Sequence, residues 1–259
     1  MIKAICCVPV SPLRVEPSHR TEMVSQLIFG ECCEVLEQTR DQWSRIRVNY
    51  DGYEGWCTSS HLSEIDEKEF GLARTPLTPE WVASLEYNGH PMMVPVGSHL
   101  TAMKNGRAQW RKNLVHYKGK TWDPGTPSTD ARSIRQLALK FLNIPYMWGG
   151  KSVFGLDCSG YVQTVFKFLG ITVLRDAYQQ ATQGESVGFL EETKTGDLAF
   201  FDNEEGRITH VGILLNANEI IHASGKVRID RIDNMGIVQS EGLLRTHHLR
   251  LIKRVLADG

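Results

Sequence analysis

The most informative stretch of this chain is Trp148-Gly149-Gly150-Lys151-Ser152-Val153-Phe154-Gly155-Leu156-Asp157-Cys158-Ser159-Gly160-Tyr161-Val162. It reads as a glycine-rich loop that passes directly into a helix, because apolar residues recur at helical spacing from Tyr161 to Leu169. Asp157 is a suitable N-cap, and Gly170 stands where a glycine commonly ends a helix. Cys158 is therefore expected in the first turn, where free backbone N–H groups and the helix dipole lower the pKa of a thiol. The simpler alternative is a buried structural cysteine.

Composition describes a globular protein with room for more than one core. The chain has 259 residues, of which 41% are hydrophobic and 23% are charged. Its net charge is −1 and no run of Lys and Arg occurs, so nucleic acid and anionic membranes are poor candidate partners. No apolar run approaches the roughly 20 residues of a membrane-spanning helix.

The N-terminus and the cysteines both favour a reducing compartment. The first residues offer too short an apolar run for a signal peptide. If Met1 is the native start, a cytoplasmic location is expected; if a signal peptide has been removed, the protein is expected to be secreted or periplasmic. The pairs Cys6-Cys7 and Cys32-Cys33 lie in strand-like runs, and no Cys-x-x-Cys spacing occurs. These four are therefore expected to be small buried hydrophobic residues and not zinc ligands.

The first half of the chain predicts β structure. Over residues 1–66, short strand signals separated by turns are typical of a small β-barrel. Residues 67–128 repeat the pattern more weakly and predict a second barrel, with a strand, a turn and a strand over residues 92–100. Residues 122–128 form a linker by composition. The strands predicted in the first barrel are Lys3–Val10, Glu22–Leu27, Glu31–Glu37, Trp43–Val48 and Gly55–Thr58.

Residues 129–259 predict an α+β domain. An amphipathic helix is expected over Ile134–Leu142, and the helix that begins at Cys158 follows it. Helices followed by an antiparallel sheet give an α+β architecture. The strands predicted after the helices are Asp197–Phe201, Ile208–Leu215 and Glu219–Ala223, with Val227–Ile232 and Arg250–Arg254 as further candidates.

Two histidines fall on one predicted hairpin. Alternation along the first strand puts His210 and Gly212 on the same face. With a three-residue turn, Leu215 pairs with Glu219. The same register pairs Gly212 with His222, so His210 and His222 become diagonal neighbours on one face. A two-residue turn would put the histidines on opposite faces, so the turn length decides the prediction.

A cysteine at a helix start and two neighbouring histidines can act as nucleophile, base and orienting group. His210 would take the thiol proton of Cys158, and His222 would accept a hydrogen bond from the other ring nitrogen and fix the tautomer. Two alternatives remain open. The histidines can be ordinary residues of a sheet, or the three side chains can bind zinc, although no fourth ligand is evident.

Several motifs in residues 129–259 resemble those of the NlpC/P60 cysteine peptidases, which have a papain-like core. The matching motifs are Ile144-Pro145-Tyr146-Met147-Trp148-Gly149-Gly150, Leu156-Asp157-Cys158-Ser159-Gly160-Tyr161-Val162, Thr195-Gly196-Asp197-Leu198-Ala199-Phe200-Phe201, Thr209-His210-Val211-Gly212-Ile213 and Ile221-His222-Ala223-Ser224. Residues 1–66 resemble a bacterial SH3 (SH3b) domain. The segments on which this second resemblance rests are Ser11-Pro12-Leu13-Arg14, Gly30-Glu31-Cys32-Cys33-Glu34-Val35-Leu36, Trp43-Ser44-Arg45-Ile46-Arg47 and Gly52-Tyr53-Glu54-Gly55-Trp56-Cys57.

The resemblance implies a catalytic set without metal or cofactor. Cys158 corresponds to the nucleophile, His210 to the base and His222 to the third polar residue. With two SH3-like barrels ahead of the peptidase domain, the chain resembles the γ-D-glutamyl-L-diamino acid endopeptidases that degrade murein peptides. Ala177 stands where that group commonly has serine. The residues that hold the substrate in that group correspond here to Tyr146, Asp157, Ser159 and Asp176.

The expected activity is hydrolysis of the γ-D-Glu–diamino acid bond in short murein peptides. The resemblance also implies that the first barrel closes one end of the cleft, so that the substrate carries a free N-terminal L-Ala. Glu22 is the candidate carboxylate for the substrate ammonium, and Tyr53, with Tyr50 as a weaker choice, is the candidate aromatic wall. Two other functions remain open: an amidase or acyltransferase with the same triad, and a non-catalytic cell-wall-binding protein that acts through its SH3b domains.

Overall fold

The computed structural model describes residues 2–71, 75–126, 129–242 and 244–256. The chain divides into two compact units. Unit 1 comprises Met1–Gly125 and Trp148–Val153, and unit 2 comprises Thr126–Met147 and Phe154–Gly259. Residues 127 and 128 of the predicted linker lie outside the described residues. Over the described ranges, no helix is long and apolar enough to cross a membrane.

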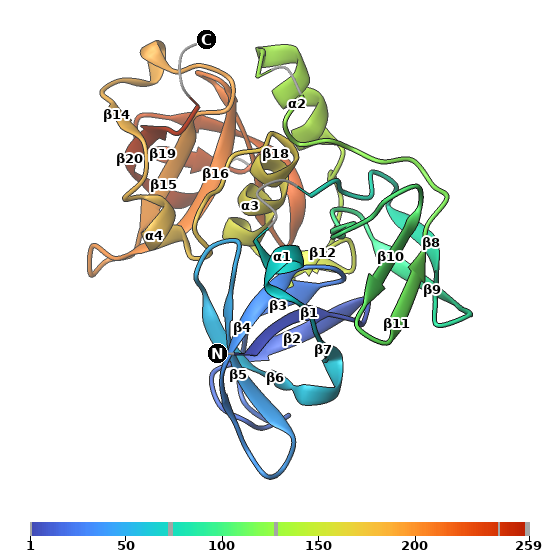
Figure 1. The fold of residues 1–259 in the computed structure, drawn as a ribbon. Coiled ribbons are helices and arrows are strands. Elements are labelled where there is room, and N and C mark those ends of the chain that lie inside the picture. Colours follow the sequence, from blue (N-terminus) through green and yellow to red (C-terminus); the bar gives the residue numbers. More distant parts are fainter. Residues whose placement is uncertain (1, 72–74, 127–128, 243, 257–259) are drawn as a thin grey trace. The chain divides into compact units, whose positions relative to one another are not determined.

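A seven-stranded antiparallel sheet forms the first part of unit 1 (Figure 1). Its strands are β1 (Ile2–Cys6), β2 (Val10–Arg14), β3 (Met23–Ile28), β4 (Cys32–Gln38), β5 (Trp43–Val48), β6 (Glu54–Thr58) and β7 (Leu62–Glu64). They follow the order β3-β2-β6-β5-β4-β1-β7, with a 3₁₀ turn at Ser59–His61 and the short helix α1 (Glu67–Phe70) after β6 and β7. Side chains alternate between buried and exposed along β5, as expected for a sheet with one face on a core.

Four of the five strands predicted here are confirmed. The fifth, predicted over Lys3–Val10, is confirmed only over Lys3–Cys6, and its continuation to Val10 is wrong. The chain leaves the sheet after β1 and begins β2 only at Val10. Pro9 lies between them, and proline has no N–H for a ladder hydrogen bond inside a central strand. The expectation of four buried cysteines is also partly wrong, because Cys7 and Cys32 are only half-buried.

A four-stranded sheet forms the second part of unit 1. It contains β8 (Val82–Tyr87), β9 (His90–Pro95), β10 (Arg107–Trp110) and β11 (Asn113–His116) in the order β10-β11-β8-β9. One apolar core is shared by the two sheets. Ile5 of β1 and Phe29, which follows β3, cluster in it with Leu85 of β8 and Trp110 of β10. The predicted strand after the turn at Gly97 is reduced to one isolated bridge, between Leu77 and His99. A second SH3 domain over residues 67–128 therefore stays a prediction.

Unit 1 also holds a short piece of the predicted peptidase segment. β12 (Lys151–Ser152) contacts β3, and the backbone N–H of Lys151 donates to Gln26 Oε1 at 2.8 Å. Gly149 has φ +73°, and a Cβ there would lie 2.4 Å from the carbonyl oxygen of Met23, so only glycine fits this approach. The strong glycine signal at the start of this stretch is thus explained by packing against the first sheet.

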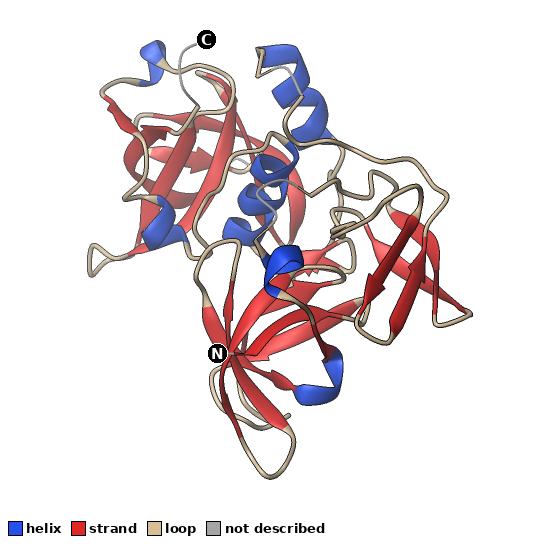
Figure 2. Ribbon diagram, viewed as in Figure 1, coloured by secondary structure: helices blue, strands red, loops and turns tan. Residues whose placement is uncertain are grey.

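Over its described residues, unit 2 contains three helices and a sheet, which Figure 2 distinguishes by colour. The helices are α2 (Ala131–Leu139), α3 (Cys158–Phe168) and α4 (Ala177–Gln180), with a 3₁₀ turn at Leu190–Glu192. The strands are β13 (Gly155–Leu156), β14 (Glu185–Val187), β15 (Leu198–Asp202), β16 (Ile208–Asn216), β17 (Glu219–Ser224), β18 (Lys226–Asp233), β19 (Gly236–Val238) and β20 (Arg245–Arg254). The sheet order is β14-β20-β15-β16-β17-β18-β19, and β19 also pairs with β20, so six strands close into a ring.

Helix α3 is buried along its whole length, whereas the sequence pattern predicted one buried stripe. All eleven of its residues are buried, because α2, α4, β16 and β17 contact it from several sides. Its polar side chains have local partners: Gln163 Nε2 donates to the carbonyl of Val173 at 3.0 Å, and the Thr164 hydroxyl donates to that of Gly160 at 2.7 Å. The predicted α+β order of helices before an antiparallel sheet is confirmed.

Candidate active site

Cys158 is the first residue of α3, as the sequence predicts. The Asp157 carboxylate caps the helix by accepting a hydrogen bond from the backbone N–H of Gly160 at 2.6 Å. The cysteine is 7% exposed, and its sulfur lies within reach of the backbone N–H of Val211 on β16. The thiol is therefore held between the start of a helix and the strand that carries His210.

The pKa of this thiol is shifted in the direction opposite to the one expected. Burial raises the pKa of Cys158 to about 12, and the charge of Asp157 adds to the increase. Backbone N–H groups of Val211 and Ser159 and the guanidinium of Arg175 lower it only in part. Loss of water around the buried sulfur thus outweighs the helix N-terminus, and the thiol is protonated at rest. Its activation depends on a base.

The two histidines lie on the hairpin of β16 and β17 and touch directly. His210 Nε2 and His222 Nδ1 are 2.8 Å apart, and the two rings meet edge to face with centroids 5.0 Å apart. Burial holds the pKa of His210 well below its usual range, with smaller effects from His222 and His247. Over the described residues, no group of three or more His, Cys, Asp or Glu side chains is arranged to hold a metal ion.

The hairpin of β16 and β17 has the predicted pairing of Gly212 with His222, but a different turn. Gly212 pairs with His222 as expected, but Asn216, and not Leu215, pairs with Glu219. A bulge between Leu214 and Asn216 adds one residue to β16, so a two-residue turn keeps both histidines on one face. The prediction of a three-residue turn and of the Leu215–Glu219 pair is therefore wrong, while the placement of the histidines is confirmed.

Gly212→Ala is expected to lower activity by displacing His222. A Cβ at position 212 would lie 2.9 Å from the Cβ of His222 and 2.7 Å from Cδ1 of Ile220, which is closer than real Cβ contacts allow. Steady-state kinetics should therefore show a reduced kcat together with a loss of stability. Gly188→Ala is the matched control, because its nearest atom is a flexible Glu192 oxygen at 3.5 Å. Equal activity of the two variants would contradict this account.

A buried carboxylate that was not predicted from the sequence lies behind His222. Asp230 Oδ2 lies 3.0 Å from His222 Nε2, and Arg228 binds both oxygens of this carboxylate. Both residues come from β18, where His222 and Arg228 are register partners. The available signal was the alternation of Arg228 and Asp230 at a spacing of two in a predicted strand, which places them on one face.

A third histidine, also missed, stacks on the candidate base. The ring of His247 on β20 lies 4.1 Å from the ring of His210, centroid to centroid, at an angle of 27°. Burial lowers the pKa of His247 to about 4, so this ring is neutral near pH 7. The ring of Phe201 also lies beside His210, with the two ring centroids 5.8 Å apart. The predicted strand began only at Arg250, and β20 begins five residues earlier.

Three of the four residues that the resemblance assigns to substrate binding, Tyr146, Asp157 and Ser159, interact with the thiol or with its immediate neighbours. Burial raises the pKa of the Tyr146 hydroxyl, and the nearby Cys158 and Asp157 add to the shift. Asp157 forms a two-bond ion pair with Arg175, at 2.6 and 3.0 Å, and the same guanidinium donates to the Ser159 hydroxyl at 2.9 Å. Arg175 is 1% exposed and was not singled out from the sequence.

Asp176 has a structural role at the start of α4. Its carboxylate accepts from the backbone of Gln179, whose side chain in turn accepts from the backbone N–H of Asp176 at 3.1 Å, which is a capping box. Asp176 is half-buried, and Ala177 is buried. Capping occupies part of this carboxylate's hydrogen-bonding capacity, as it does for Asp157.

The two candidates from the first barrel lie in unit 1. Glu22 is exposed, and its Oε1 accepts a hydrogen bond from the indole Nε1 of Trp148 at 2.6 Å. Tyr53, like Tyr50, is half-buried and packs against the apolar core of the first sheet. Glu22 is therefore hydrogen-bonded to the loop that precedes the helix of Cys158 in the sequence. Tyr53 instead packs on the interior of the barrel.

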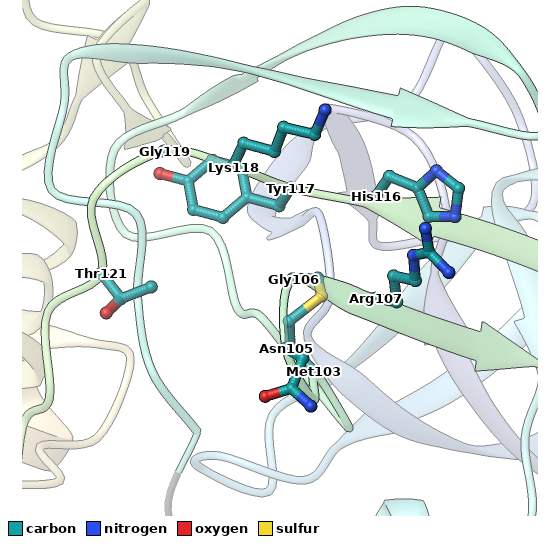
Figure 3. Close-up of a pocket in the computed structure, with 9 residues that line it drawn as sticks. All are labelled: Met103, Asn105, Gly106, Arg107, His116, Tyr117, Lys118, Gly119 and Thr121. Carbon is teal, nitrogen blue, oxygen red and sulfur yellow. The ribbon is translucent and has the colours of Figure 1, made fainter.

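A separate pocket lies beside β10 and β11 in unit 1 (Figure 3). Arg107, His116 and Lys118 supply cationic or neutral nitrogen groups, and Tyr117 supplies an aromatic wall. None of Cys158, His210 and His222 is among its lining residues, and all three belong to unit 2. The pocket of Figure 3 is thus a surface hollow of the second sheet and not part of the Cys158 site.

Comparisons with known proteins agree with this geometry. Residues 143–241 match the model of the NlpC/P60 family, and residues 13–62 match that of the bacterial dipeptidyl-peptidase SH3 domain. A gamma-D-glutamyl-L-lysine dipeptidyl-peptidase of Bacillus cereus is 28% identical over 251 residues, which cover 86% of this chain and 74% of that protein. A protein of the same name from Bacillus subtilis is 44% identical over 95 residues, 36% of this chain and 32% of that protein.

The fold is also found among solved structures. A crystal structure of an NlpC/P60 family protein from Bacillus cereus superposes with a TM-score of 0.80 at 21% sequence identity, covering 98% of this chain and 100% of that chain. Cys158, His210 and His222 all fall within the residues that match the peptidase family. The chain belongs to the NlpC/P60 family of cysteine peptidases and carries a bacterial SH3 domain in its first unit.

Proposed function

We propose that this peptidoglycan peptidase hydrolyses the bond between the γ-carboxyl group of D-Glu and the amino group of a diamino acid. The observation that carries the proposal is the hydrogen-bonded pair of His210 and His222 on the hairpin beside the start of α3, where Cys158 supplies the nucleophile. The two Bacillus relatives are named for a γ-D-glutamyl-L-lysine bond, which supports this bond as the one cleaved.

The reaction follows from the protonation states at rest. As Cys158 Sγ attacks the γ-carbonyl carbon, His210 takes the thiol proton, because both groups are neutral beforehand. The tetrahedral intermediate then collapses as the C–N bond breaks, and the His210 imidazolium gives its proton to the leaving amino group. Water, deprotonated by His210, attacks the thioester and releases the D-Glu γ-carboxyl group with the thiol restored.

We further propose that the substrate is a short peptide with a free N-terminal L-Ala, as in recycling of cell-wall peptides in the cytoplasm. Glu22 is the proposed partner of the L-Ala ammonium, and Tyr53 is the proposed aromatic wall beside it. The exposure of the Glu22 carboxylate supports this role, since it can accept further hydrogen bonds. Its contact with Trp148 gives it a fixed position.

Mass spectrometry of L-Ala-γ-D-Glu-L-Lys after incubation tests the proposal. The expected products are L-Ala-D-Glu and free lysine, while the N-acetylated peptide should be cleaved tens-fold more slowly, because a desolvated charge pair is lost at a cost of about 2–5 kcal/mol. Glu22→Gln should reproduce this loss on the free peptide, since Gln keeps an acceptor for Trp148 but removes the charge. Glu16→Gln, at an exposed position of the same barrel, is the control.

Each alternative function predicts a different outcome of this experiment. A non-catalytic wall-binding protein yields no product, and an amidase or acyltransferase releases a different fragment or transfers the acyl group to an added amine. Equal cleavage of free and acetylated peptides would remove Glu22 and the free L-Ala from the proposal. It would leave the assignment of the bond intact.

A further inference from the structure

We propose that Asp230 and Arg228 form the outer end of a relay that places the proton of His210 on Nε2 and leaves Nδ1 as the base for Cys158. Asp230 is in this sense a positioning residue, because it acts on the reaction through His222. The proposal rests on the assignment of Cys158 and His210 as nucleophile and base. It does not depend on which peptide bond is cleaved.

Asp230 is surrounded by donors. It is 1% exposed, and each of its two carboxylate oxygens has two partners. Oδ2 accepts from Arg228 Nε at 2.7 Å and faces His222 Nε2 at 3.0 Å. Oδ1 accepts from Arg228 Nη2 at 3.0 Å and from the backbone N–H of Ser240 at 2.9 Å. This arrangement fits an ionised carboxylate, which can only accept hydrogen bonds.

The hydrogen-bond directions then follow along the chain of rings. Because Asp230 only accepts, His222 Nε2 must carry a proton and donate it. A neutral His222 then has a lone pair on Nδ1, so it accepts from Nε2 of His210 at 2.8 Å. A neutral His210 that carries its proton on Nε2 has its lone pair on Nδ1. That nitrogen is the one not used by His222, and it is the atom available to take the thiol proton.

The electrostatics of the buried groups agree with this order. Although burial alone would raise it, hydrogen bonds from His222, Arg228 and Ser240 hold the pKa of Asp230 well below its usual range. Burial lowers the pKa of His222, Asp230 opposes the shift, and the Arg228 charge lowers the pKa further. Two further titratable neighbours among the described residues are His247, whose ring centroid lies 5.7 Å from that of His222, and the exposed Glu241, 3.7 Å from Arg228.

Arg228 therefore does two things at once. It keeps Asp230 ionised, and it prevents the carboxylate from drawing a second proton onto His222. A doubly protonated His222 would donate from Nδ1 and could no longer accept from His210. His210 would then have to carry its proton on Nδ1, and the site would lose its base.

Asp230→Asn is expected to reverse the direction of the hydrogen bonds along His222 and His210. The amide oxygen is retained at the Oδ1 position, because Ser240 N–H and Arg228 Nη2 both require an acceptor there. The NH₂ group then occupies the Oδ2 position and donates to His222 Nε2, which forces the proton of His222 onto Nδ1. His210 is left protonated on Nδ1. From analogous replacements in other triads, kcat should fall by about a thousand-fold or more.

The test measures alkylation of Cys158 by iodoacetamide across pH, followed by peptide mapping, beside hydrolysis. Asp230→Asn should slow alkylation of Cys158 at neutral pH as strongly as hydrolysis. Asp233→Asn is the matched control. Asp233 lies on the same strand and forms a similar two-bond ion pair with Arg245, but its side chain is half-exposed, whereas that of Asp230 is buried. This control should leave both rates unchanged. Because alkylation needs no peptide, a wrong substrate assignment would not affect it.

Arg228→Gln separates positioning from a structural role. Removing the cation raises the pKa of His222, so the acid limb of the alkylation profile should move to higher pH while the rate at high pH is largely kept. A uniform loss at all pH values, or an unshifted acid limb, would overturn the proposal. So would Asp230→Asn with the wild-type alkylation rate.

A measurement on the unmodified protein covers the case in which a variant does not fold. ¹⁵N spectra of the histidine rings should show both His210 and His222 protonated on Nε2 and unprotonated on Nδ1 near pH 7. Protonation of His210 on Nδ1 would overturn the relay directly.

Discussion

Replacing Cys158 with alanine is expected to abolish peptide hydrolysis while the fold is kept, with kcat lowered by about 10⁴-fold or more. The thiol is the only group of the protein that forms a bond to the substrate carbon in this mechanism. The substitution removes one buried sulfur at the start of a helix whose N-cap, Asp157, remains. Steady-state hydrolysis of the tripeptide and thermal unfolding measure the two effects separately.

His210→Ala should be as damaging as Cys158→Ala, and the double variant should be no worse than either single one. Residues that act as one chemical unit are strongly non-additive. His222→Ala should leave some activity, because His222 orients His210 and does not itself exchange a proton with the substrate. Cys57→Ala is the control, since Cys57 is a buried cysteine of the first barrel that forms no disulfide. Wild-type turnover by Cys158→Ala would refute the cysteine peptidase mechanism.

The parts of this site that could be predicted are those set by nearby residues. The helix that starts at Cys158 follows from an N-cap and a helical period within a dozen residues, and its first residue was predicted correctly. The shared face of His210 and His222 follows from strand alternation and one hairpin. Even there the turn length was wrong, because a bulge and a shorter turn give the same register as a longer turn.

The parts that could not be predicted depend on partners distant in the sequence. Asp230, Arg228 and His247 become meaningful only when β18 and β20 are placed beside the hairpin, and a strand period does not specify its neighbours. The pKa of Cys158 is a similar case. The helix start is local and lowers the pKa, whereas the burial that raises it comes from the whole of unit 2.

Removing the charge of Glu31 is expected to destabilise unit 1 more than any exposed charge replacement. Glu31 and Lys151 form an ion pair with 3.5 Å between Oε1 and Nζ, and each side chain is 1% exposed. The second oxygen of Glu31 accepts from the backbone N–H of Ile28 at 2.9 Å, and His99 Nε2 lies 4.0 Å from the first. Glu31→Gln leaves the ammonium of Lys151 buried without its carboxylate, which should cost about 3–5 kcal/mol.

Urea unfolding followed by tryptophan fluorescence can measure this cost in the full chain. Glu54→Gln is the matched control. Glu54 pairs with Arg45 and Arg47, each at 2.8 Å, but these side chains are 31–46% exposed, and exposed pairs contribute about 0–1 kcal/mol each. In Glu31→Gln/Lys151→Met no charge of the pair remains, so most of the loss should be recovered. A cost for Glu31→Gln no larger than that for Glu54→Gln would show that the pair does not stabilise unit 1.

The position of Lys151 in the sequence gives this pair a wider consequence. Lys151 lies inside the residues that match the NlpC/P60 family, yet Glu31 and Gln26, which hold it, belong to the first barrel. A chain cut before residue 126 would leave the Lys151 side chain and backbone N–H without these partners. The barrel is therefore expected to be required for a stable peptidase, whereas an SH3 domain that served only as a tether could be removed without loss of stability.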